Sequence, residues 1–125
     1  MRYTLRLLTL DQFGRAATLI CALELERQRD PEALGAWPIE IGMWVGLTAT
    51  PNRMGGRGDD GKSTARAKVE AFKREPRLNP SPIPLETCPW CGSRFGPDSF
   101  HLAPDSLAPR DLRIYCVSRS CEFAA

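Results

Sequence analysis

The amino-acid sequence predicts an α/β segment in residues 1–78, a proline-rich linker in residues 79–84 and a small cysteine-rich module in residues 85–125. Three observations lead to this prediction. In the first segment, apolar residues recur at helical spacing in two stretches and alternate in a third. The linker has a proline at every second position, which favours an extended chain. Finally, all but one of the five cysteines lie in the last module.

Composition restricts the class of protein. The chain has 125 residues, of which 42% are hydrophobic and 26% charged, and these values are typical of a soluble globular protein. No stretch approaches the roughly 20 apolar residues that span a bilayer. The first residues also lack the apolar core and cleavage site of a secretion signal. We therefore expect a cytoplasmic protein without membrane contact.

The first elements are predicted in chain order. Residues 3–8 favour a short strand. Thr9 and Gln12 form a capping box that begins a helix, and this helix is expected to end near Arg29 because Asp30 precedes a proline. Cys21 falls on this helix and is expected to be a buried, unreactive thiol.

A helical turn and a second strand are expected next. Pro31 is suited to the first position of a turn that Gly35 ends. Apolar residues then alternate over residues 39–45, which predicts a mostly buried strand. This strand is suited to the middle of a larger sheet than these residues can build, because a two-stranded sheet is only marginally stable.

A glycine-rich loop in residues 46–63 precedes a second helix in residues 64–75, whose apolar face carries Ala65, Val69 and Phe72. Residues 51–80 hold eight basic and four acidic residues, a net charge of +4. Such a stretch can contact a phosphate backbone, although a solvated helix face is the simpler interpretation.

The late cysteines have the spacing of a zinc ribbon. Cys88 and Cys91 form a C-x-x-C knuckle followed by glycine, and Cys116 and Cys121 supply a second pair. An odd total of five cysteines excludes a complete disulfide framework. Four thiolates can close a structural Zn²⁺ site that has no open coordination position. His101 lies between the pairs and is expected not to be a ligand, because the four sulfurs already complete the shell.

The loop also matches the phosphate-binding motif G-x-x-x-x-G-K-[ST], whose defining residues here are Gly56, Gly61, Lys62 and Ser63. Three features argue against nucleotide binding. The predicted strand ends well before the loop, Asp59 and Asp60 place negative charge where phosphate would bind, and no suitable acidic strand follows to hold Mg²⁺.

A resemblance to a known family covers nearly the whole chain except the glycine-rich loop. The sequence resembles an internal stretch of large superfamily 2 helicase-like ATPases, and most nearly the helicase component of DISARM-type bacterial phage-defence systems. The matching stretches are residues 2–13, 16–24, 41–46, 50–52 and 88–92. This resemblance implies that the α/β segment is part of a RecA-like motor domain and that the zinc ribbon is an insertion within it.

The resemblance also implies a set of contacts. The opening residues correspond to helicase motif Ia, in which Thr4, Arg6 and Gln12 fall at the Thr, Arg and Gln positions. Thr4 and Arg6 would touch the nucleic-acid backbone, a contact that fixes position without reading sequence. Weak, non-specific nucleic acid and other components of a defence complex are the partners implied.

The sequence departs from this family by having neither the ATP-binding loop, nor the acidic Mg²⁺-binding box, nor the second motor domain. We therefore expect a truncated helicase segment that is catalytically inactive alone. Two alternatives remain. One is a minimal nucleotide-binding protein that uses the glycine-rich loop. The other is an independent zinc-ribbon adaptor that binds nucleic acid or a protein through Arg94, Arg110, Arg113 and Arg119.

Overall fold

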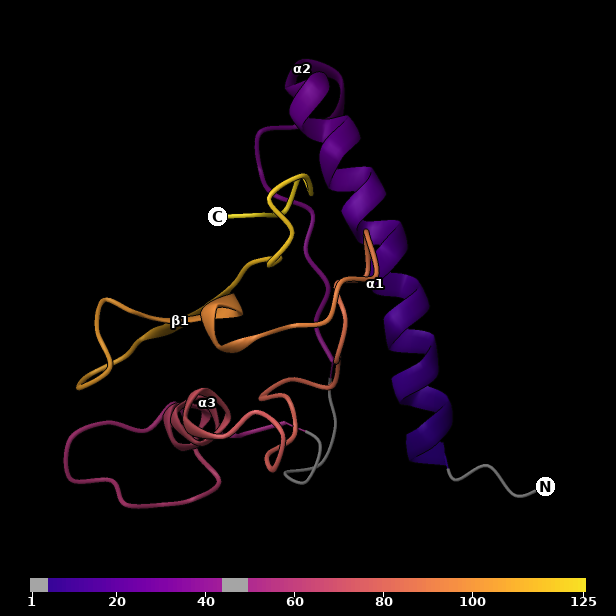
Figure 1. The fold of residues 1–125 in the computed structure, drawn as a ribbon. Helices are drawn as coiled ribbons and strands as arrows, with labels where there is room; N and C mark the ends of the chain where they lie inside the picture. Colours follow the sequence, from indigo (N-terminus) through magenta and orange to yellow (C-terminus); the bar gives the residue numbers. More distant parts are fainter. Residues whose placement is uncertain (1–4, 44–49) are drawn as a thin grey trace. The chain divides into compact units, whose positions relative to one another are not determined.

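The computed structural model describes residues 5–43 and 50–125 (Figure 1), which fall into two compact units, Met1–Val45 and Gly46–Ala125. None of the helices in these residues has the length and apolar character that a membrane crossing requires. The elements in chain order are α1 (Leu5–Arg29), α2 (Pro31–Leu34), α3 (Ala65–Arg74), the 3-10 turn η1 (Pro97–Ser99), β1 (Phe100–Ala103) and β2 (Asp111–Ile114).

The first helix is longer than the sequence predicts. It begins at Leu5, so the strand predicted over residues 3–8 is wrong where the structure describes it, and Thr9 lies inside the helix instead of capping it. A β-strand needs a second strand with which to form hydrogen bonds, and β1 and β2 are the only paired strands in the described residues. The described part of the chain therefore offers no strand to pair with residues 5–8. The three leucines and one arginine of residues 5–8 are good helix formers, so the local helix propensity decides the conformation here. Cys21 is half-buried, not buried.

The predicted turn is confirmed as α2. The Asp30 carboxylate accepts a hydrogen bond from the backbone N–H of Ala33 at 3.1 Å, and Gly35 ends the turn with a φ of 95°. The strand predicted over residues 39–45 is not formed in residues 39–43, and the remaining two residues lie outside the described part. The Ile39 backbone N–H donates instead to the Glu24 carboxylate at 2.9 Å, which ties this segment to α1.

Helix α3 forms as predicted, within one residue at each end. Thr64 caps its first turn by accepting a hydrogen bond from the Ala67 backbone N–H, and the helix ends before Pro76. Val69 and Phe72 are buried on one face, which agrees with the periodicity of the sequence.

That face packs against the cysteine-rich half of the chain. Phe100 is completely buried, and its ring meets Phe72 at 5.4 Å and Phe95 at 5.6 Å between centroids, both edge-to-face. Pro82, within the predicted linker, is also fully buried. The structure therefore joins α3 and residues 79–84 to the C-terminal unit, whereas the sequence prediction assigned α3 to the first domain. The apolar face of α3 requires another apolar surface to pack against, and Phe100 supplies it through its contact with Phe72.

Strands β1 and β2 form an antiparallel hairpin (Figure 1), in which Phe100 pairs with Ile114 and Ala103 with Asp111. The mixed α/β composition is thus confirmed, but the only sheet in the described residues is this two-stranded hairpin.

Candidate metal centre

The first pair of cysteines lies on a tight knuckle. The Gly92 backbone N–H donates to the Cys88 carbonyl at 2.9 Å, and the Cys88 N–H donates to the Ser93 carbonyl at 2.8 Å. Gly92 adopts a φ of 79°, a conformation that favours glycine and lets the chain turn back directly after Cys91. Both sulfurs therefore lie on the same side of the turn.

The second pair lies on another turn at the end of the hairpin. The Cys121 N–H donates to the Ser118 carbonyl at 3.0 Å, and the Cys116 N–H donates to the Phe123 carbonyl at 2.8 Å. The Ser118 backbone N–H also points at the Cys116 sulfur, 3.4 Å away. Such N–H···S contacts favour the ionised, metal-binding form of cysteine.

Trp90 links the two knuckles. Its indole N–H donates to the Glu122 carboxylate at 2.7 Å, and its ring meets Phe123 edge-to-face with centroids 6.2 Å apart. Trp90 was not identified from the sequence. Its place between two ligands of a C-x-x-C motif is the signal that could have indicated one.

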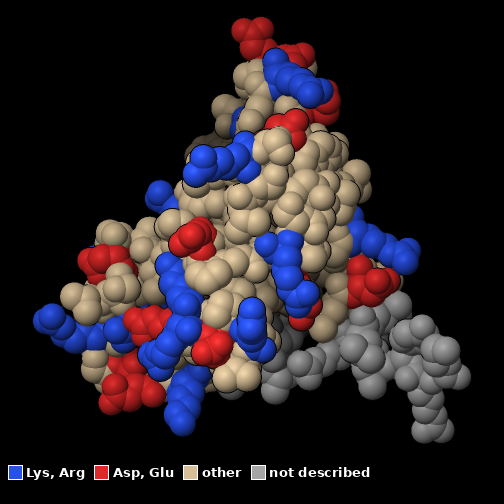
Figure 2. Space-filling model, viewed as in Figure 1, with Lys and Arg blue, Asp and Glu red and all other residues tan. Residues whose placement is uncertain are grey.

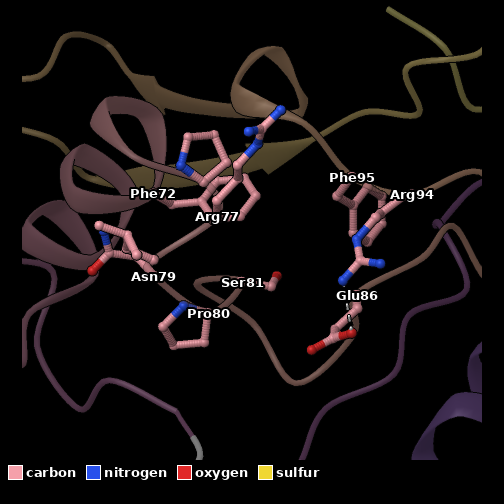
Figure 3. A pocket seen from close by; sticks show the side chains of 10 residues that line it. Phe72, Arg77, Asn79, Pro80, Ser81, Glu86, Arg94 and Phe95 are labelled. Carbon is pink, nitrogen blue, oxygen red and sulfur yellow. Dashed lines mark hydrogen bonds and ion pairs between the residues drawn. The ribbon is translucent and has the colours of Figure 1, made fainter.

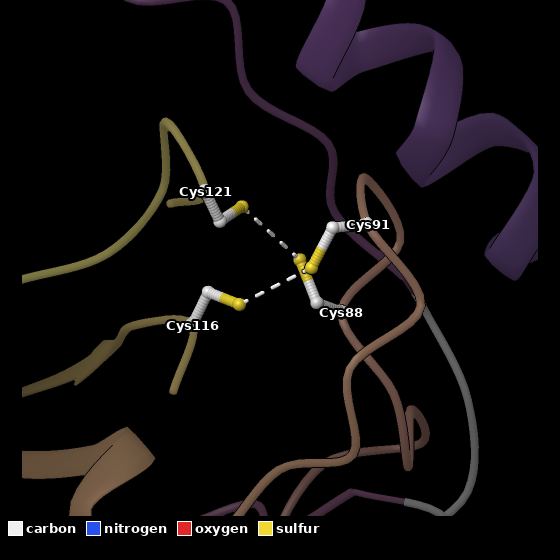
Figure 4. A group of neighbouring side chains, drawn as sticks. All are labelled: Cys88, Cys91, Cys116 and Cys121. Atoms are coloured by element: carbon white, nitrogen blue, oxygen red, sulfur yellow. Dashed lines mark hydrogen bonds between the residues drawn. The ribbon is translucent and has the colours of Figure 1, made fainter. Parts of the chain in front are cut away.

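The four sulfurs converge from these two knuckles, as Figure 4 shows, and all lie within 4.8 Å of one another. Cys91 Sγ lies 3.4 Å from Cys116 Sγ, and Cys88 Sγ lies 4.0 Å from Cys121 Sγ. A tetrahedral zinc site with bonds near 2.3 Å requires sulfur–sulfur separations of about 3.8 Å. The cluster therefore fits a four-coordinate Zn²⁺ ion, and each pair of close sulfurs joins one knuckle to the other.

The electrostatic environment differs among the ligands. Hydrogen bonds with Ser93, whose Oγ lies 3.2 Å from Cys91 Sγ, lower the pKa of Cys91 to about 6. Burial raises the pKa of Cys121 to about 12 and also raises that of Cys116. Metal binding must displace protons from the buried thiols, so the affinity for zinc should fall in acid. Ser93 was not identified from the sequence.

His101 lies outside this cluster. It is exposed, its Nε2 lies 2.8 Å from the Asp98 carbonyl oxygen, and its ring meets Tyr115 edge-to-face. With four sulfurs available, the centre can be closed and structural, holding the fold rather than activating a water molecule.

The glycine-rich loop is held by its own side chains. The Asp59 carboxylate accepts a hydrogen bond from the Gly61 backbone N–H at 3.1 Å and pairs with Arg53 at 3.2 Å. The Asp59 carboxylate thus accepts the hydrogen bond of a backbone N–H group, and a phosphate-binding loop directs such groups at its phosphate ligand. Lys62 and Ser63 are exposed. Whether Gly56, Gly61, Lys62 and Ser63 bind nucleotide stays a prediction.

The residues assigned by resemblance lie at the opposite end of the chain. Thr4 falls outside the described residues. Arg6 is in α1, in a stretch whose side chains are not described, and Gln12 is exposed on the same helix. Arg6 and Gln12 belong to the unit Met1–Val45, whereas the four clustered cysteines belong to the unit Gly46–Ala125.

Acidic side chains interrupt the basic stretch on the face that Figure 2 shows. On the face seen in Figure 2, acidic side chains lie among the basic ones over α3 and the preceding loop. Arg66 pairs with Glu70 at 3.3 Å, one helical turn along α3. This interleaving favours the solvated-face interpretation of the charge run.

Comparison with known proteins gives one similarity over the whole chain. No protein-family model matches. The DISARM protein DrmA of Bacillus paralicheniformis is 31% identical over 125 residues, which cover 99% of this chain and 11% of that protein. The chain therefore spans a small part of its relative's length. The resemblance inferred from the sequence is confirmed: this chain is homologous to a segment of the DISARM protein DrmA.

Proposed function

We propose that this chain is a zinc-stabilised segment of a DISARM-type DNA helicase, located in the cytoplasm and catalytically inactive as an isolated chain. The similarity to DrmA is the main support for this proposal. It extends over 99% of this chain but only 11% of the relative, as expected for a segment of a larger protein. ATP hydrolysis by such a motor would require an acidic box and a second motor domain, which we expect the remainder of the larger protein to supply.

Zinc has a structural role in this proposal. Cys88, Cys91, Cys116 and Cys121 would hold the ion, which supplies a cross-link between the two knuckles when bound. The convergence of the four sulfurs within 4.8 Å supports this assignment. A small domain with few large apolar side chains gains much of its folding free energy from such a cross-link.

The N-terminal segment would belong to a RecA-like motor domain. Thr4, Arg6 and Gln12 would then contact the nucleic-acid backbone. The exposed position of Gln12 supports access to such a ligand. Other components of a defence complex are further proposed partners.

Salt dependence tests the nucleic-acid contact. Fluorescence anisotropy with a labelled single-stranded oligonucleotide should show weak binding that weakens between about 50 and 200 mM salt. Arg6→Ala should reduce the slope of log K against log salt by about 0.7, the value for one phosphate contact. Arg15→Ala is the matched control, because Arg15 is also on α1 and is exposed. Equal effects of the two substitutions would refute the assignment of Arg6.

A groove favours a second candidate function, that of an independent zinc-ribbon adaptor. The groove has a volume of about 570 Å³ and is lined by Arg94, one of the four arginines considered for an adaptor, and by Arg77. Figure 3 shows Arg94 directed at Glu86, with Phe72 and Arg77 on the other side. The ion pair of Arg94 with Glu86 is long, 3.4 Å, and exposed, so an anionic partner could replace it.

The same anisotropy assay separates the two candidates. An adaptor that binds nucleic acid predicts that Arg94→Ala weakens binding and that Arg6→Ala does not. The helicase-segment proposal predicts the reverse. Arg113 pairs with Asp111 at 3.4 Å on the hairpin, and Arg113→Ala therefore serves as a second test of the adaptor surface.

A further inference from the structure

The four cysteines of the metal centre differ in their access to solvent. Cys91 is exposed, whereas Cys88, Cys116 and Cys121 are only 4%, 7% and 8% exposed. A solution oxidant must reach a sulfur before it can react with it, and accessible thiolates are the ones that oxidise. Exposure alone therefore selects Cys91 as the point of attack.

The distances select its partner. Cys116 Sγ lies 3.4 Å from Cys91 Sγ, closer than the 4.0 Å that separates Cys88 Sγ from Cys121 Sγ. The disulfide bond length is about 2.05 Å, so the two sulfurs must approach by a little more than an ångström. Rotation of the exposed Cys91 side chain can supply such a displacement without disturbing the buried sulfur.

We propose that Cys91 is an oxidation site for peroxides, that Cys116 resolves the oxidised sulfur as a disulfide, and that zinc is lost as a result. This inference rests on the proposed zinc site for its last step only. The order in which the cysteines oxidise depends on exposure and spacing and not on the ion.

The chemistry balances with hydrogen peroxide as the oxidant. The Cys91 thiolate attacks one peroxide oxygen, the O–O bond breaks, and the products are a sulfenic acid and hydroxide. The Cys116 thiolate then attacks the Cys91 sulfur, the S–O bond breaks, and a second hydroxide leaves. The two sulfurs together lose two electrons, and the peroxide gains them.

The zinc-free protein that oxidation produces differs from the zinc-free protein that a chelator produces. Formation of the disulfide removes two of the four thiolates, and Cys88 and Cys121 alone cannot hold Zn²⁺ in a closed site. However, the new bond joins the same two knuckles that zinc joined. Oxidation should therefore release the metal while keeping the knuckles linked, whereas chelation leaves them unlinked.

The test treats the zinc-loaded wild-type chain with hydrogen peroxide. A chromogenic chelator follows zinc release, and peptide mass spectrometry under non-reducing conditions identifies disulfides at early times. We expect the Cys91–Cys116 disulfide to form first, with the loss of about one zinc ion per disulfide formed. Cys21→Ser should leave the rate of zinc loss unchanged, since Cys21 lies outside the cluster.

Three results would be decisive. Early modification of a buried cysteine before Cys91 would overturn the proposal, as would a first disulfide other than Cys91–Cys116. Zinc retained in full after that disulfide has formed would overturn the metal-release step. A purified chain without zinc would refute the proposed metal site instead, and mass spectrometry of its oxidation would still test the order of reaction.

Discussion

Substitution of Phe72 tests whether α3 and the metal centre form one folding unit. Phe72 is only 6% exposed, and its ring contacts the fully buried Phe100 at 5.4 Å. Truncation of a buried phenylalanine to alanine costs about 3–5 kcal/mol. If zinc binding and folding of this unit are coupled, the whole cost appears as lost zinc affinity, which corresponds to a factor of about 10²–10⁴.

Competition with a chelator of known affinity measures this loss. Leu78→Ala is the matched control, because Leu78 follows the same helix and is 81% exposed, so its truncation should change zinc affinity little. If α3 instead folds separately, as the sequence prediction had it, Phe72→Ala will melt the helix without changing zinc affinity. Equal zinc affinities of the wild-type chain and the Phe72→Ala variant would therefore refute the reasoning.

Three further substitutions follow from the structure. Gly92→Ala should destabilise the zinc-bound chain by about 1–2 kcal/mol in thermal unfolding because of its φ of 79°, whereas Gly42→Ala, where φ is not positive, should not. Ser93→Ala should weaken zinc binding about tenfold, measured by chelator competition, because it removes the hydroxyl 3.2 Å from Cys91 Sγ. The hydrogen bond from Arg27 lowers the pKa of Glu24 to about 2 from its usual 4.5, so the stability this pair contributes should be lost as pH falls from about 4.5 towards 2. Carboxyl NMR shifts should follow this titration, and Glu24→Gln should remove it.

The sequence predicts those features that depend on nearby residues. The four cysteines could be paired by spacing because each knuckle is closed by hydrogen bonds within a few residues, such as that from Gly92 to Cys88. The capping of α3 by Thr64 and the end of α2 at Gly35 are local in the same way. In each case the residues that determine the conformation lie within one turn of it.

Features that depend on distant residues were predicted less well. A strand over residues 39–45 needs partners that the described residues do not provide, and its apolar alternation alone cannot supply them. The proline-rich residues 79–84 suggested an extended linker, yet Pro82 is fully buried, and the neighbouring Ile83 packs against the core cluster that contains Phe72 and Phe100.

The buried sulfurs and the phenylalanine core are parts of one cluster. Cys88, Cys116 and Cys121 belong to the same contiguous group of buried residues as Phe72 and Phe100. Release of the metal would leave unlinked thiols within that group, and loss of the aromatic contacts would leave the knuckles without support. A bound metal ion would therefore stabilise the docking of α3, and α3 would in turn hold the knuckles at a separation that zinc can bridge. This reciprocity is the physical reason that chelation should unfold α3 together with residues 85–123, and amide hydrogen exchange that stayed slow in α3 after zinc removal would show that the two are independent.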